Sequence, residues 1–434
     1  MKKQIRAAML WAACITTSLP SMAALNADEQ RMADFIEQRK TQAMALLEES
    51  VNINSGTMNF AGVKSVAELL MPEFQTLGFD VRFEDGGEFN RAGHLIAKLE
   101  GGNGPKILLI GHLDTVFEPS SPFQTFAYVD ENHVSGPGVA DMKGGNIIML
   151  EALRALHAAG KLASMNIMVV MTGDEELSGR PLALSKKALI DGAKWADIAL
   201  GFENGDGNPA TANVSRRGSV DWVLTVTGTP AHSSQVFKPT VGAGAIYEAS
   251  RILNAFYTKL RSEQLLTFNP GRIIGGTEVT HDKSSNSGTT FGKNNVVAEH
   301  AVVTGDIRAV SQEQLTRVQH KMRAIVQQSL PQTGAEITFG EGYPPLSPSA
   351  GNQQLLNLYS EVSQDLGQGK VAAVNPLNAG AADVSFTSEY VEMALDGLGM
   401  SGSGGHTVKE TAVISALPAQ AKRAAILLSR LNER

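Results

Sequence analysis

The sequence has almost no cysteine: Cys14 is the single one among 434 residues. It lies in a leading segment, residues 1–23, which we expect to be removed, so the mature chain would contain no thiol. This excludes a disulfide and a cysteine nucleophile. Any zinc site in the mature protein must therefore be built from His, Asp and Glu side chains.

Basic charge and long apolar runs are also scarce. Lys and Arg number 37 against 44 Asp and Glu, a formal net charge of -7, which argues against a nucleic-acid or anionic-membrane partner. No stretch beyond the leading segment is apolar for long enough to cross a membrane. Aromatic residues make up only 6% but hydrophobic residues 43%, which is a globular composition. The length fits two domains better than one.

The leading segment has the pattern of a secretion signal. A positively charged start precedes the mostly apolar run 7–17, and a small-x-small cleavage site ends at Ala23. A membrane anchor is the alternative, but the run is too short to span a bilayer. A lipid anchor on Cys14 is less favoured, because Trp11 stands where such sites prefer a branched aliphatic residue. We predict a signal peptide, 1–23, whose removal changes the net charge from -7 to -10, and a periplasmic or secreted protein.

Strand and helix patterns alternate through the first half of the chain. The predicted helices are 28–53, 62–78, 145–159 and 181–190, and the predicted strands are 106–111, 166–171 and 197–202. Alternation of this kind implies an α/β fold, with a mainly parallel sheet covered by helices. Similar elements resume at 351–365 and run to the end. We therefore assign residues 24–214 and 344–434 to one α/β domain.

The pattern changes between residues 215 and 343. Residues 219–228 alternate apolar and polar, as a half-exposed antiparallel strand does. The elements that follow are a helix at 242–260, strands near 272–279 and 296–307, a helix at 311–329 and a strand near 335–342. This order, β-α-β-β-α-β, describes a module with one open sheet face. We predict that residues 215–343 form an inserted α+β domain.

Acidic residues and a histidine stand where the predicted strands end. They are His112 and Asp114 after strand 106–111, Asp141 just before a helix, Glu175 and Glu176 after strand 166–171, and Glu203 after strand 197–202. The carboxyl ends of the strands in an open α/β sheet share one edge, and ligands bind there. Four separate positions therefore converge on one crevice. Histidine and several carboxylates without cysteine suit two zinc ions.

Each of these residues, taken singly, has an ordinary structural explanation. A His-x-Asp pair is usually a surface or capping feature, and Asp141 is in place to cap the helix that begins near Lys143. A Glu-Glu pair after a strand is more often solvated than catalytic, and Glu203 lies in an Asn-Gly-Asp loop. Only their shared placement favours a metal site.

Six segments in a fixed order resemble the co-catalytic zinc metallopeptidases of the aminoacylase and glutamate carboxypeptidase family. They are His112-Leu-Asp-Thr-Val116, Gly138-Val-Ala-Asp-Met-Lys-Gly-Gly145, Thr172-Gly-Asp-Glu-Glu176, Pro230-Ala-His-Ser-Ser234, Asn294-Asn-Val-Val297 and Gly404-Gly-His-Thr407. Together they cover nearly all of the mature chain and are highly specific, whereas any one alone would be weak. The leading segment and the context of His406 look most like the exported bacterial glutamate carboxypeptidases.

The resemblance implies two zinc ions per chain and a role for each site residue. The ligands would be Asp141 bridging both ions, His112 and Glu203 at one ion, and Glu176 and His406 at the other. Glu175 would be the base that takes a proton from a water shared by the metals and passes it to the leaving amine. Asp114 would accept the other ring N–H of His112. The resemblance also implies a cis peptide after Asp141.

Three further residues come from the inserted domain, which the resemblance identifies as a lid and dimerisation domain. His232 would donate to the developing oxyanion; without the resemblance, an exposed loop histidine is the better explanation. The planar fork of Arg308 suits a substrate carboxylate, although a surface salt bridge explains it equally well. Asn295 would donate to the same end of the substrate. The family also implies a homodimer. In several relatives, the loop that corresponds to the His232 loop reaches the active site of the partner chain.

The predicted function is zinc-dependent hydrolysis of an amide bond next to a free carboxylate, in a small peptide or N-acyl amino acid, as in a glutamate carboxypeptidase. A deacylase or desuccinylase of N-acyl amino acids would use the same metal site, and pocket shape would decide between them. A binding protein that kept the fold but lost catalysis is the third hypothesis. The presence of Glu175 and of all five ligands argues against it.

Overall fold

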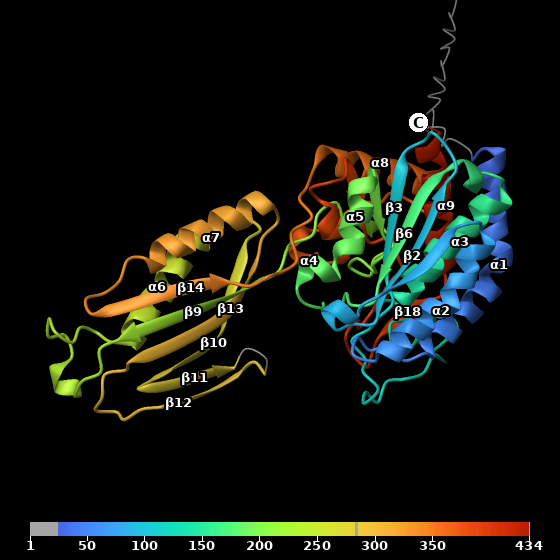
Figure 1. The fold of residues 1–434 in the computed structure, drawn as a ribbon. Helices are drawn as coiled ribbons and strands as arrows, with labels where there is room; N and C mark the ends of the chain where they lie inside the picture. The colour runs from blue at the N-terminus through green and yellow to red at the C-terminus, as the bar shows by residue number, and fades with distance from the viewer. Residues whose placement is uncertain (1–24, 283–284, 434) are drawn as a thin grey trace, which may run out of the picture.

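The chain folds into two lobes joined by a pair of extended connections (Figure 1). The computed structural model describes residues 25–282 and 285–433, so the predicted signal peptide, 1–23, lies outside the described residues. The larger lobe is built from the first and last parts of the chain, and the smaller lobe from the middle part. Among the described helices, none combines the length and apolarity needed to cross a membrane.

A six-stranded sheet forms the centre of the larger lobe. Its order is β1 (Asp80–Asp85), β2 (Gly93–Glu100), β6 (Asn166–Thr172), β3 (Lys106–His112), β7 (Ile198–Gly201) and β16 (Met393–Leu395). The last four strands are parallel to one another, whereas β2 runs antiparallel to both β1 and β6. The predicted α/β class with a mainly parallel sheet is therefore confirmed. The edge strand β1 and its neighbour β2 were not predicted.

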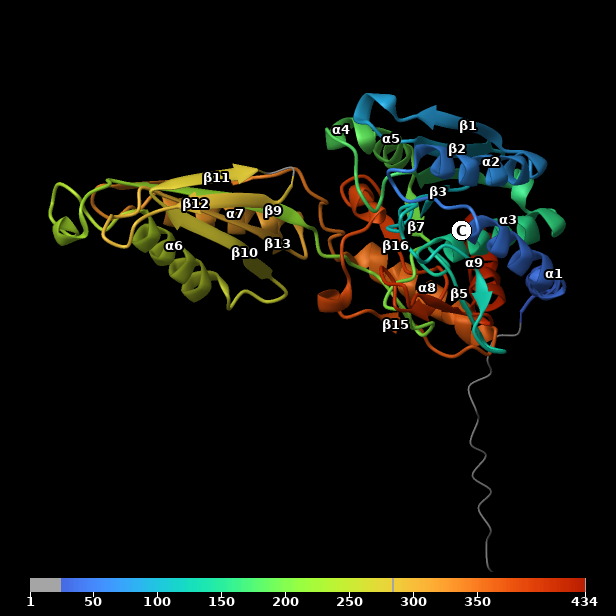
Figure 2. The same ribbon diagram turned by 90° about the horizontal axis from the view of Figure 1, so that it is seen from below.

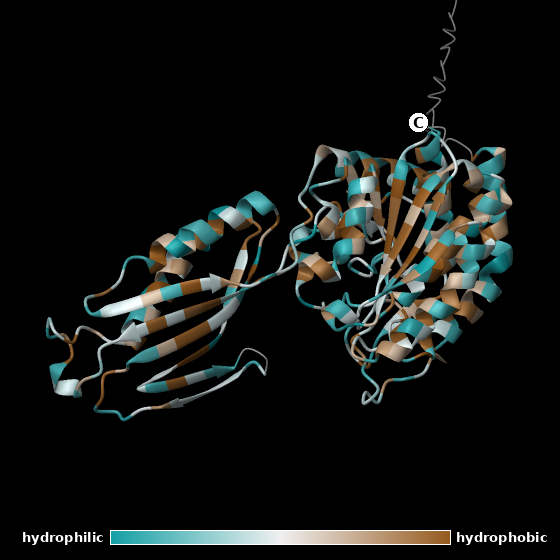
Figure 3. Cartoon of the chain, viewed as in Figure 1, coloured by the Kyte–Doolittle hydropathy of each residue, from teal (hydrophilic) through white to brown (hydrophobic). Residues whose placement is uncertain are grey.

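Helices cover both faces of this sheet (Figures 1 and 3). One core cluster includes α1 (Ala27–Val51), α2 (Phe60–Thr76), α3 (Lys143–Ala158), α8 (Ala350–Asp365) and α9 (Ala416–Asn432), and the other includes α5 (Lys187–Trp195). In β3, Ile107 and Leu109 belong to the first cluster, and Leu108 and Ile110 to the second. A strand that is apolar on both faces must be covered on both, which explains its continuous hydrophobic run.

The predicted helix 181–190 is interrupted. The structure has a short α4 (Leu182–Ser185) and then α5, with Lys186 between them. The ammonium of Lys186 is fully buried, 3.0 Å from Asp174 and 3.1 Å from Asp383. A buried ammonium needs such partners to offset its loss of water. We attribute the break to this ion-pair network, which helical periodicity does not reveal.

The smaller lobe is a four-stranded antiparallel sheet with helices on one face. Its order is β10 (Thr267–Gly276), β13 (His300–Arg308), β9 (Val220–Gly228) and β14 (Thr333–Phe339), and its helices are α6 (Ala245–Leu260) and α7 (Gln312–Val326). In β9, Val220, Trp222, Leu224 and Val226 are buried, and the residues between them are not. This period of two gives the sheet one buried face and one open face.

A β-hairpin that was not predicted lies along the open side of the smaller lobe. It consists of β11 (Glu278–Asp282) and β12 (Ser287–Phe291), and Figure 2 shows it on the opposite side of β10 from α6. The predicted strand 272–279 therefore covers the end of β10 and the start of the hairpin. Every residue of β12 is exposed, so the hairpin has no apolar period from which it could be predicted.

The two connections between the lobes pair with each other. Arg216 pairs with Leu346, and Ser219 with Tyr343, through backbone hydrogen bonds of 3.0–3.1 Å. We call residues 213–219 and 340–346 the inter-lobe ribbon.

The larger lobe also contains two small sheets. One consists of β4 (Ala127–Tyr128), β5 (His133–Ser135), β17 (Gly402–Ser403) and β18 (Thr411–Val413), and the other of β8 (Thr211–Ala212) and β15 (Ala372–Ala373).

Candidate metal centre and active site

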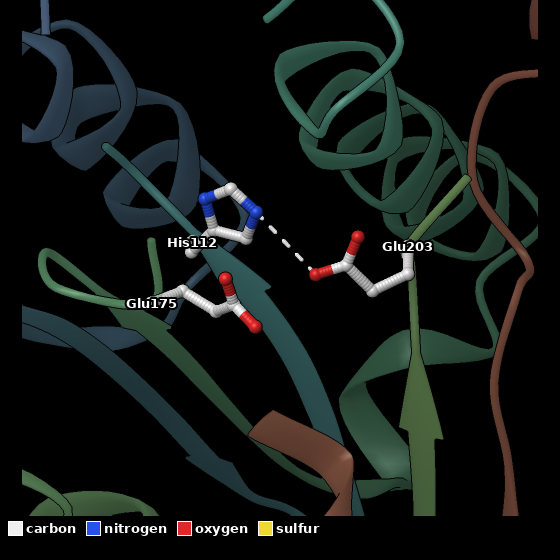
Figure 4. A group of neighbouring side chains, drawn as sticks. All are labelled: His112, Glu175 and Glu203. Carbon is white, nitrogen blue, oxygen red and sulfur yellow. Dashed lines mark ion pairs between the residues drawn. The ribbon is translucent and has the colours of Figure 1, made fainter. Parts of the chain in front are cut away.

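The carboxyl ends of β3, β6 and β7 bring the predicted site residues to one edge of the central sheet. His112 is the last residue of β3, Glu175 and Glu176 follow β6, and Glu203 follows β7. Figure 4 shows the side chains of His112, Glu175 and Glu203 converging from three separate segments. Asp141 reaches the same place from the turn before α3.

Asp141 lies at the centre of a group of five side chains. Its Oδ1 atom is 3.4 Å from His112 Nε2, which is itself 3.3 Å from Glu203 Oε1. Its Oδ2 atom is 3.1 Å from His406 Nε2, which is 3.2 Å from Glu176 Oε2. The five side chains therefore form two groups of three that share Asp141.

The spacing of these atoms fits two metal ions. Zinc binds histidine nitrogen and carboxylate oxygen at about 2.0–2.1 Å in tetrahedral geometry, so neighbouring ligand atoms stand roughly 3.3–3.4 Å apart. The four contacts in the two groups span 3.1–3.4 Å, which is close to that spacing. Asp141 directs one oxygen toward each group, as a bridging carboxylate must. Nitrogen and oxygen donors without sulfur also suit zinc.

Burial and mutual repulsion perturb the ionisable groups of the site. Burial, followed by the charge of Asp141, raises the pKa of Glu203 to about 7. Burial, followed by the charge of Glu203, raises the pKa of Glu175 well above its usual range. Hydrogen bonds to Asp141 and Glu176 raise the pKa of His406 to about 11. These shifts mark a concentration of negative charge that bound cations would neutralise.

Glu175 lies beside one of the two groups of three, close to His112 and Glu203. One of its oxygens lies within 4.8 Å of ligand atoms of His112 and Glu203, and Figure 4 shows its carboxylate directed between them. Within the described part of the chain, it forms no ion pair with either histidine of the two groups. A carboxylate beside the ligands, and outside both groups, is placed where a general base is needed.

Asp114 holds the segment that carries Glu175 and Glu176. Its buried carboxylate accepts the backbone N–H groups of both residues, each at 3.1 Å, and the Thr57 hydroxyl at 2.6 Å. The expected contact with His112 also exists, but it differs in detail. The nearest acceptor for the ring Nδ1 is the backbone oxygen of Asp114, at 3.0 Å, and the carboxylate is 3.4 Å away. The carboxylate is turned instead toward the segment of the two glutamates.

Glu410 is a site residue that the sequence analysis missed. It is fully buried, and its carboxylate accepts the backbone N–H groups of Gly138, Ala140 and Asp141 at 3.1, 2.9 and 3.1 Å. Burial raises the pKa of Glu410 to about 7. The only signal in the sequence is an acidic residue four positions after His406. Nothing in that spacing indicates which backbone the carboxylate binds.

The backbone around Asp141 has the form that the resemblance implies. The peptide bond between Asp141 and Met142 is cis. Helix α3 begins at Lys143, and its N-cap residue is Met142, without a side-chain cap bond. The capping explanation for Asp141 is therefore wrong, because its carboxylate faces the two histidines instead.

The three site residues predicted in the smaller lobe lie at its two ends. Arg308 ends β13 near the inter-lobe ribbon, and its Nε donates to Asp306 at 2.9 Å. His232 and Asn295 lie together past the other end of β9, where a backbone N–H of the His232 loop donates to the Asn295 oxygen at 2.8 Å. In Figure 1 the arrow of β9 points away from the larger lobe.

The length of β9 keeps His232 away from the metal ligands of its own chain. The strand has 9 residues, and at about 3.3 Å per residue it spans roughly 27–30 Å. His232 is exposed there, with its Nδ1 atom 2.9 Å from Ser234 Oγ. The structure therefore brings together the seven predicted residues of the larger lobe, but not His232 or Asn295.

Comparisons with known proteins agree with this geometry. The model of peptidase family M20/M25/M40 matches residues 108–430. Carboxypeptidase G2 from a Pseudomonas species is 26% identical over 392 residues, covering 89% of this chain and 88% of that protein. A succinyl-diaminopimelate desuccinylase from Alkalilimnicola ehrlichii is 26% identical over 279 residues, covering 60% and 67%.

A solved structure has the same fold. The YXEP protein of Bacillus subtilis, described as a dinuclear metal binding peptidase, has a TM-score of 0.64 at 16% identity and covers 92% of this chain and 99% of that one. The family model spans most of the chain, including His112, Asp141, Glu176, Glu203 and His406. The chain therefore belongs to peptidase family M20/M25/M40 and is a metal-dependent hydrolase of peptide or amide bonds.

Proposed function

We propose that this protein is a two-zinc hydrolase that cleaves an amide bond next to a free carboxylate, in the manner of a glutamate carboxypeptidase. The observation that carries the proposal is the pair of ligand groups that share Asp141, with Glu175 beside them. Zinc is the proposed metal because the donors are histidine nitrogen and carboxylate oxygen in near-tetrahedral spacing. The match to carboxypeptidase G2 along most of both chains supports the carboxypeptidase hypothesis.

The side chains of the site divide the chemistry between them. Two bound zinc ions would supply Lewis acidity at the scissile carbonyl and at the attacking water. Glu175 takes the proton from that water on its carboxylate oxygen and later delivers it to the leaving nitrogen. Asp114 and Glu410 hold the backbones of Glu175 and Asp141 before substrate binds, so little reorganisation is needed during the reaction.

Arg308 is proposed to bind the free carboxylate of the substrate. Asn295 lies beside His232 at the other end of the lobe, so its proposed contact with the same end of the substrate would come from a second copy of the chain. Asp306 contacts the guanidinium through Nε at 2.9 Å, which orients the fork and is compatible with two parallel bonds from the Nη atoms. The side chain is 37% exposed, on the lobe that faces the metal-bearing lobe across the inter-lobe ribbon. A carboxylate clamp at this position would set the distance between the substrate terminus and the scissile bond.

A homodimer is proposed because His232 is remote from the metal ligands of its own chain. A second copy would bring its His232 to this active site as the oxyanion donor. Exposed apolar side chains on the smaller lobe support an interface there: Ile246, Tyr247 and Tyr257 on α6 and Ile273 on β10 are 48–57% exposed. We also propose that the mature protein is periplasmic or secreted, on the basis of residues 1–23.

The second candidate function is deacylation or desuccinylation of an N-acyl amino acid. This function would use the same ligands and the same base, and the match to a succinyl-diaminopimelate desuccinylase supports it as the alternative. An inactive binding protein of this fold is the least supported hypothesis, because Glu175 and the five ligand side chains are all present.

A substrate panel tests the proposal. The purified zinc-loaded protein is given dipeptides and N-acyl amino acids with different terminal residues, each with a free and an amidated carboxylate. We expect amidation to lower kcat/KM by roughly tenfold to a hundredfold, since a charged clamp is lost. Arg308→Ala should hydrolyse both forms equally poorly, whereas Arg317→Ala, on α7, should behave as wild type. Equal rates on free and amidated substrates would reject the carboxypeptidase hypothesis in favour of a general amidase.

A further inference from the structure

A buried polar layer lies behind the metal ligands, on the side of the central sheet that faces α5. Its centre is a cavity of about 10 Å³ lined by His112, Glu203, Asp383 and Asp396, among others. This volume is close to the minimum for one water molecule. Asp383 and Asp396 are at most 3% exposed. The layer therefore joins two buried aspartates to residues of the metal centre.

One strand of the inter-lobe ribbon reaches this layer through Tyr343. Its hydroxyl oxygen is 3.1 Å from the backbone oxygen of Glu175, 3.1 Å from Asp383 Oδ1 and 3.0 Å from Ser178 Oγ. A hydroxyl has one proton to donate and two lone pairs that accept. It can thus donate to Glu175 or Asp383 while it accepts from Ser178. It holds both ends of the segment 175–178 when it donates to the Glu175 oxygen, and Asp383 Oδ1 then still has the ammonium of Lys186 as a donor, at 3.1 Å.

The ring of Tyr343 is held separately from its hydroxyl. It packs edge-on against Phe386, with ring centroids 4.9 Å apart, and the ammonium of Lys186 lies 5.4 Å from its centre. A phenylalanine at this position would keep both contacts. The hydroxyl can therefore be removed without opening a cavity, and its loss affects the hydrogen bonds alone.

The other strand of the ribbon reaches the same layer through Arg216. Its buried guanidinium pairs with Asp396 and donates to the backbone oxygen of Gly380 at 3.1 Å. Asp396 Oδ1 is in turn 3.4 Å from the backbone nitrogen of Glu203. Each strand of the ribbon thus reaches the backbone of one carboxylate residue of the site: Glu175 through Tyr343, and Glu203 through Arg216 and Asp396.

We propose that Tyr343 is a positioning residue that couples the inter-lobe ribbon to Glu175. Tyr343 pairs with Ser219 in the ribbon and also contacts the Glu175 carbonyl. A displacement of the ribbon would therefore shift the backbone of Glu175 directly, with no further side chain between them. The inference rests on the proposed role of Glu175 as general base. Because Tyr343 contacts the backbone of Glu175 and not a carboxylate, its role is to orient the base, while the backbone of Glu176 is held separately by Asp114.

The test compares Tyr343→Phe with a matched variant of another tyrosine. Tyr343 is half-buried, whereas Tyr359, in α8 of the same lobe, is fully buried and donates its hydroxyl to Gln420 at 2.9 Å, away from the site. We expect Tyr343→Phe to lower kcat about tenfold, with KM changed less than about twofold and with unchanged zinc content. Tyr359→Phe should leave kcat and KM unchanged. A wild-type kcat for Tyr343→Phe, or equal losses in both variants, would overturn the inference.

A double-mutant cycle separates this inference from the proposed function. If Tyr343 acts through Glu175, Tyr343→Phe added to Glu175→Gln should cause no further loss in single-turnover rate. A further tenfold loss would show that Tyr343 acts independently, which rejects the inference and leaves the base in place. Near-normal turnover of Glu175→Gln alone would instead reject the base, and the inference with it.

Discussion

At the scale of single residues, Glu175 and Glu176 are adjacent but differ in what their side chains contact. The carboxylate of Glu176 lies 3.2 Å from His406 within one ligand group. That of Glu175 lies outside both groups, near His112 and Glu203. Both backbones are fixed by the same buried aspartate. This division supports the proposed roles, in which Glu176 binds a metal ion and Glu175 transfers a proton.

Glu175→Gln should therefore separate chemistry from binding. The amide has nearly the same shape but cannot accept the proton, so we expect kcat to fall by about 10²–10⁴ while both metals and the fold are kept. Steady-state kinetics, metal analysis and circular dichroism measure the three quantities. Glu313→Gln, at a side chain 90% exposed on α7, is the control and should be fully active. Loss of metal from Glu175→Gln, or near-normal turnover, would refute the base assignment.

Single residues were predictable from sequence where their chemistry coincides with the end of a strand. His112 and Glu203 belong to this kind, because parallel strands must end at one edge. Glu410 and Tyr343 were not predictable, because each contacts the backbone of a segment more than a hundred positions away. A side chain that binds a distant backbone leaves no pattern in its own neighbourhood.

At the scale of elements, the turn before α3 depends on a residue from the far end of the chain. Three residues of that turn, Gly138, Ala140 and Asp141, donate their backbone N–H groups to the Glu410 carboxylate. Glu410 in turn stands four positions after His406. Glu410 therefore connects the loop of His406 to the turn of Asp141, the proposed bridging ligand.

Glu410→Gln should weaken metal binding. A glutamine has only one acceptor oxygen. Its NH₂ group would face a backbone N–H that donates to a carboxylate oxygen in the wild-type protein. Outer-shell changes of this kind cost about 10–100-fold in metal affinity, which competition with a zinc chelator measures. Glu361→Gln, on the exposed side of α8, should bind zinc as wild type. Unchanged affinity in Glu410→Gln would show that the turn holds Asp141 without this clamp.

Helices and strands were predictable from the sequence where burial imposes a regular pattern of apolar residues. The run of apolar residues in β3 and the alternation in β9 each gave the right strand, because one is covered on both faces and the other on one. The exposed strand β12 has no such period. The break at Lys186 was missed for another reason: a buried ion pair overrides helical periodicity, and the partners are set only by the tertiary fold.

At the scale of the whole molecule, the smaller lobe places its predicted site residues at opposite ends. Arg308 lies beside the inter-lobe ribbon, whereas His232 is a strand length farther away. One chain therefore holds the proposed metal ligands, the proposed base and the proposed carboxylate clamp, whereas the proposed oxyanion donor His232 lies far from them. The proposed dimer completes the site from the second copy.

Complementation tests the shared site. His232→Ala and Glu175→Gln, each inactive alone, are mixed under conditions that allow subunit exchange. A mixed dimer has one site with both lesions and one site with neither, so random exchange should restore about a quarter of wild-type activity. His300→Ala, at a half-exposed histidine of the same lobe, should be active by itself. No recovery despite proven exchange, or a fully active monomer, would place His232 outside the partner's site.

The central claim of two metal ions bridged by Asp141 is tested most directly by metal content. The purified protein is loaded with zinc, freed of excess metal and measured by elemental analysis alongside its activity. The shared geometry of Asp141, with contacts of 3.4 and 3.1 Å to the two histidines, predicts about two zinc ions per chain. His112→Ala should lose metal and activity together. Full activity with no more than one tightly bound ion per chain would contradict the account.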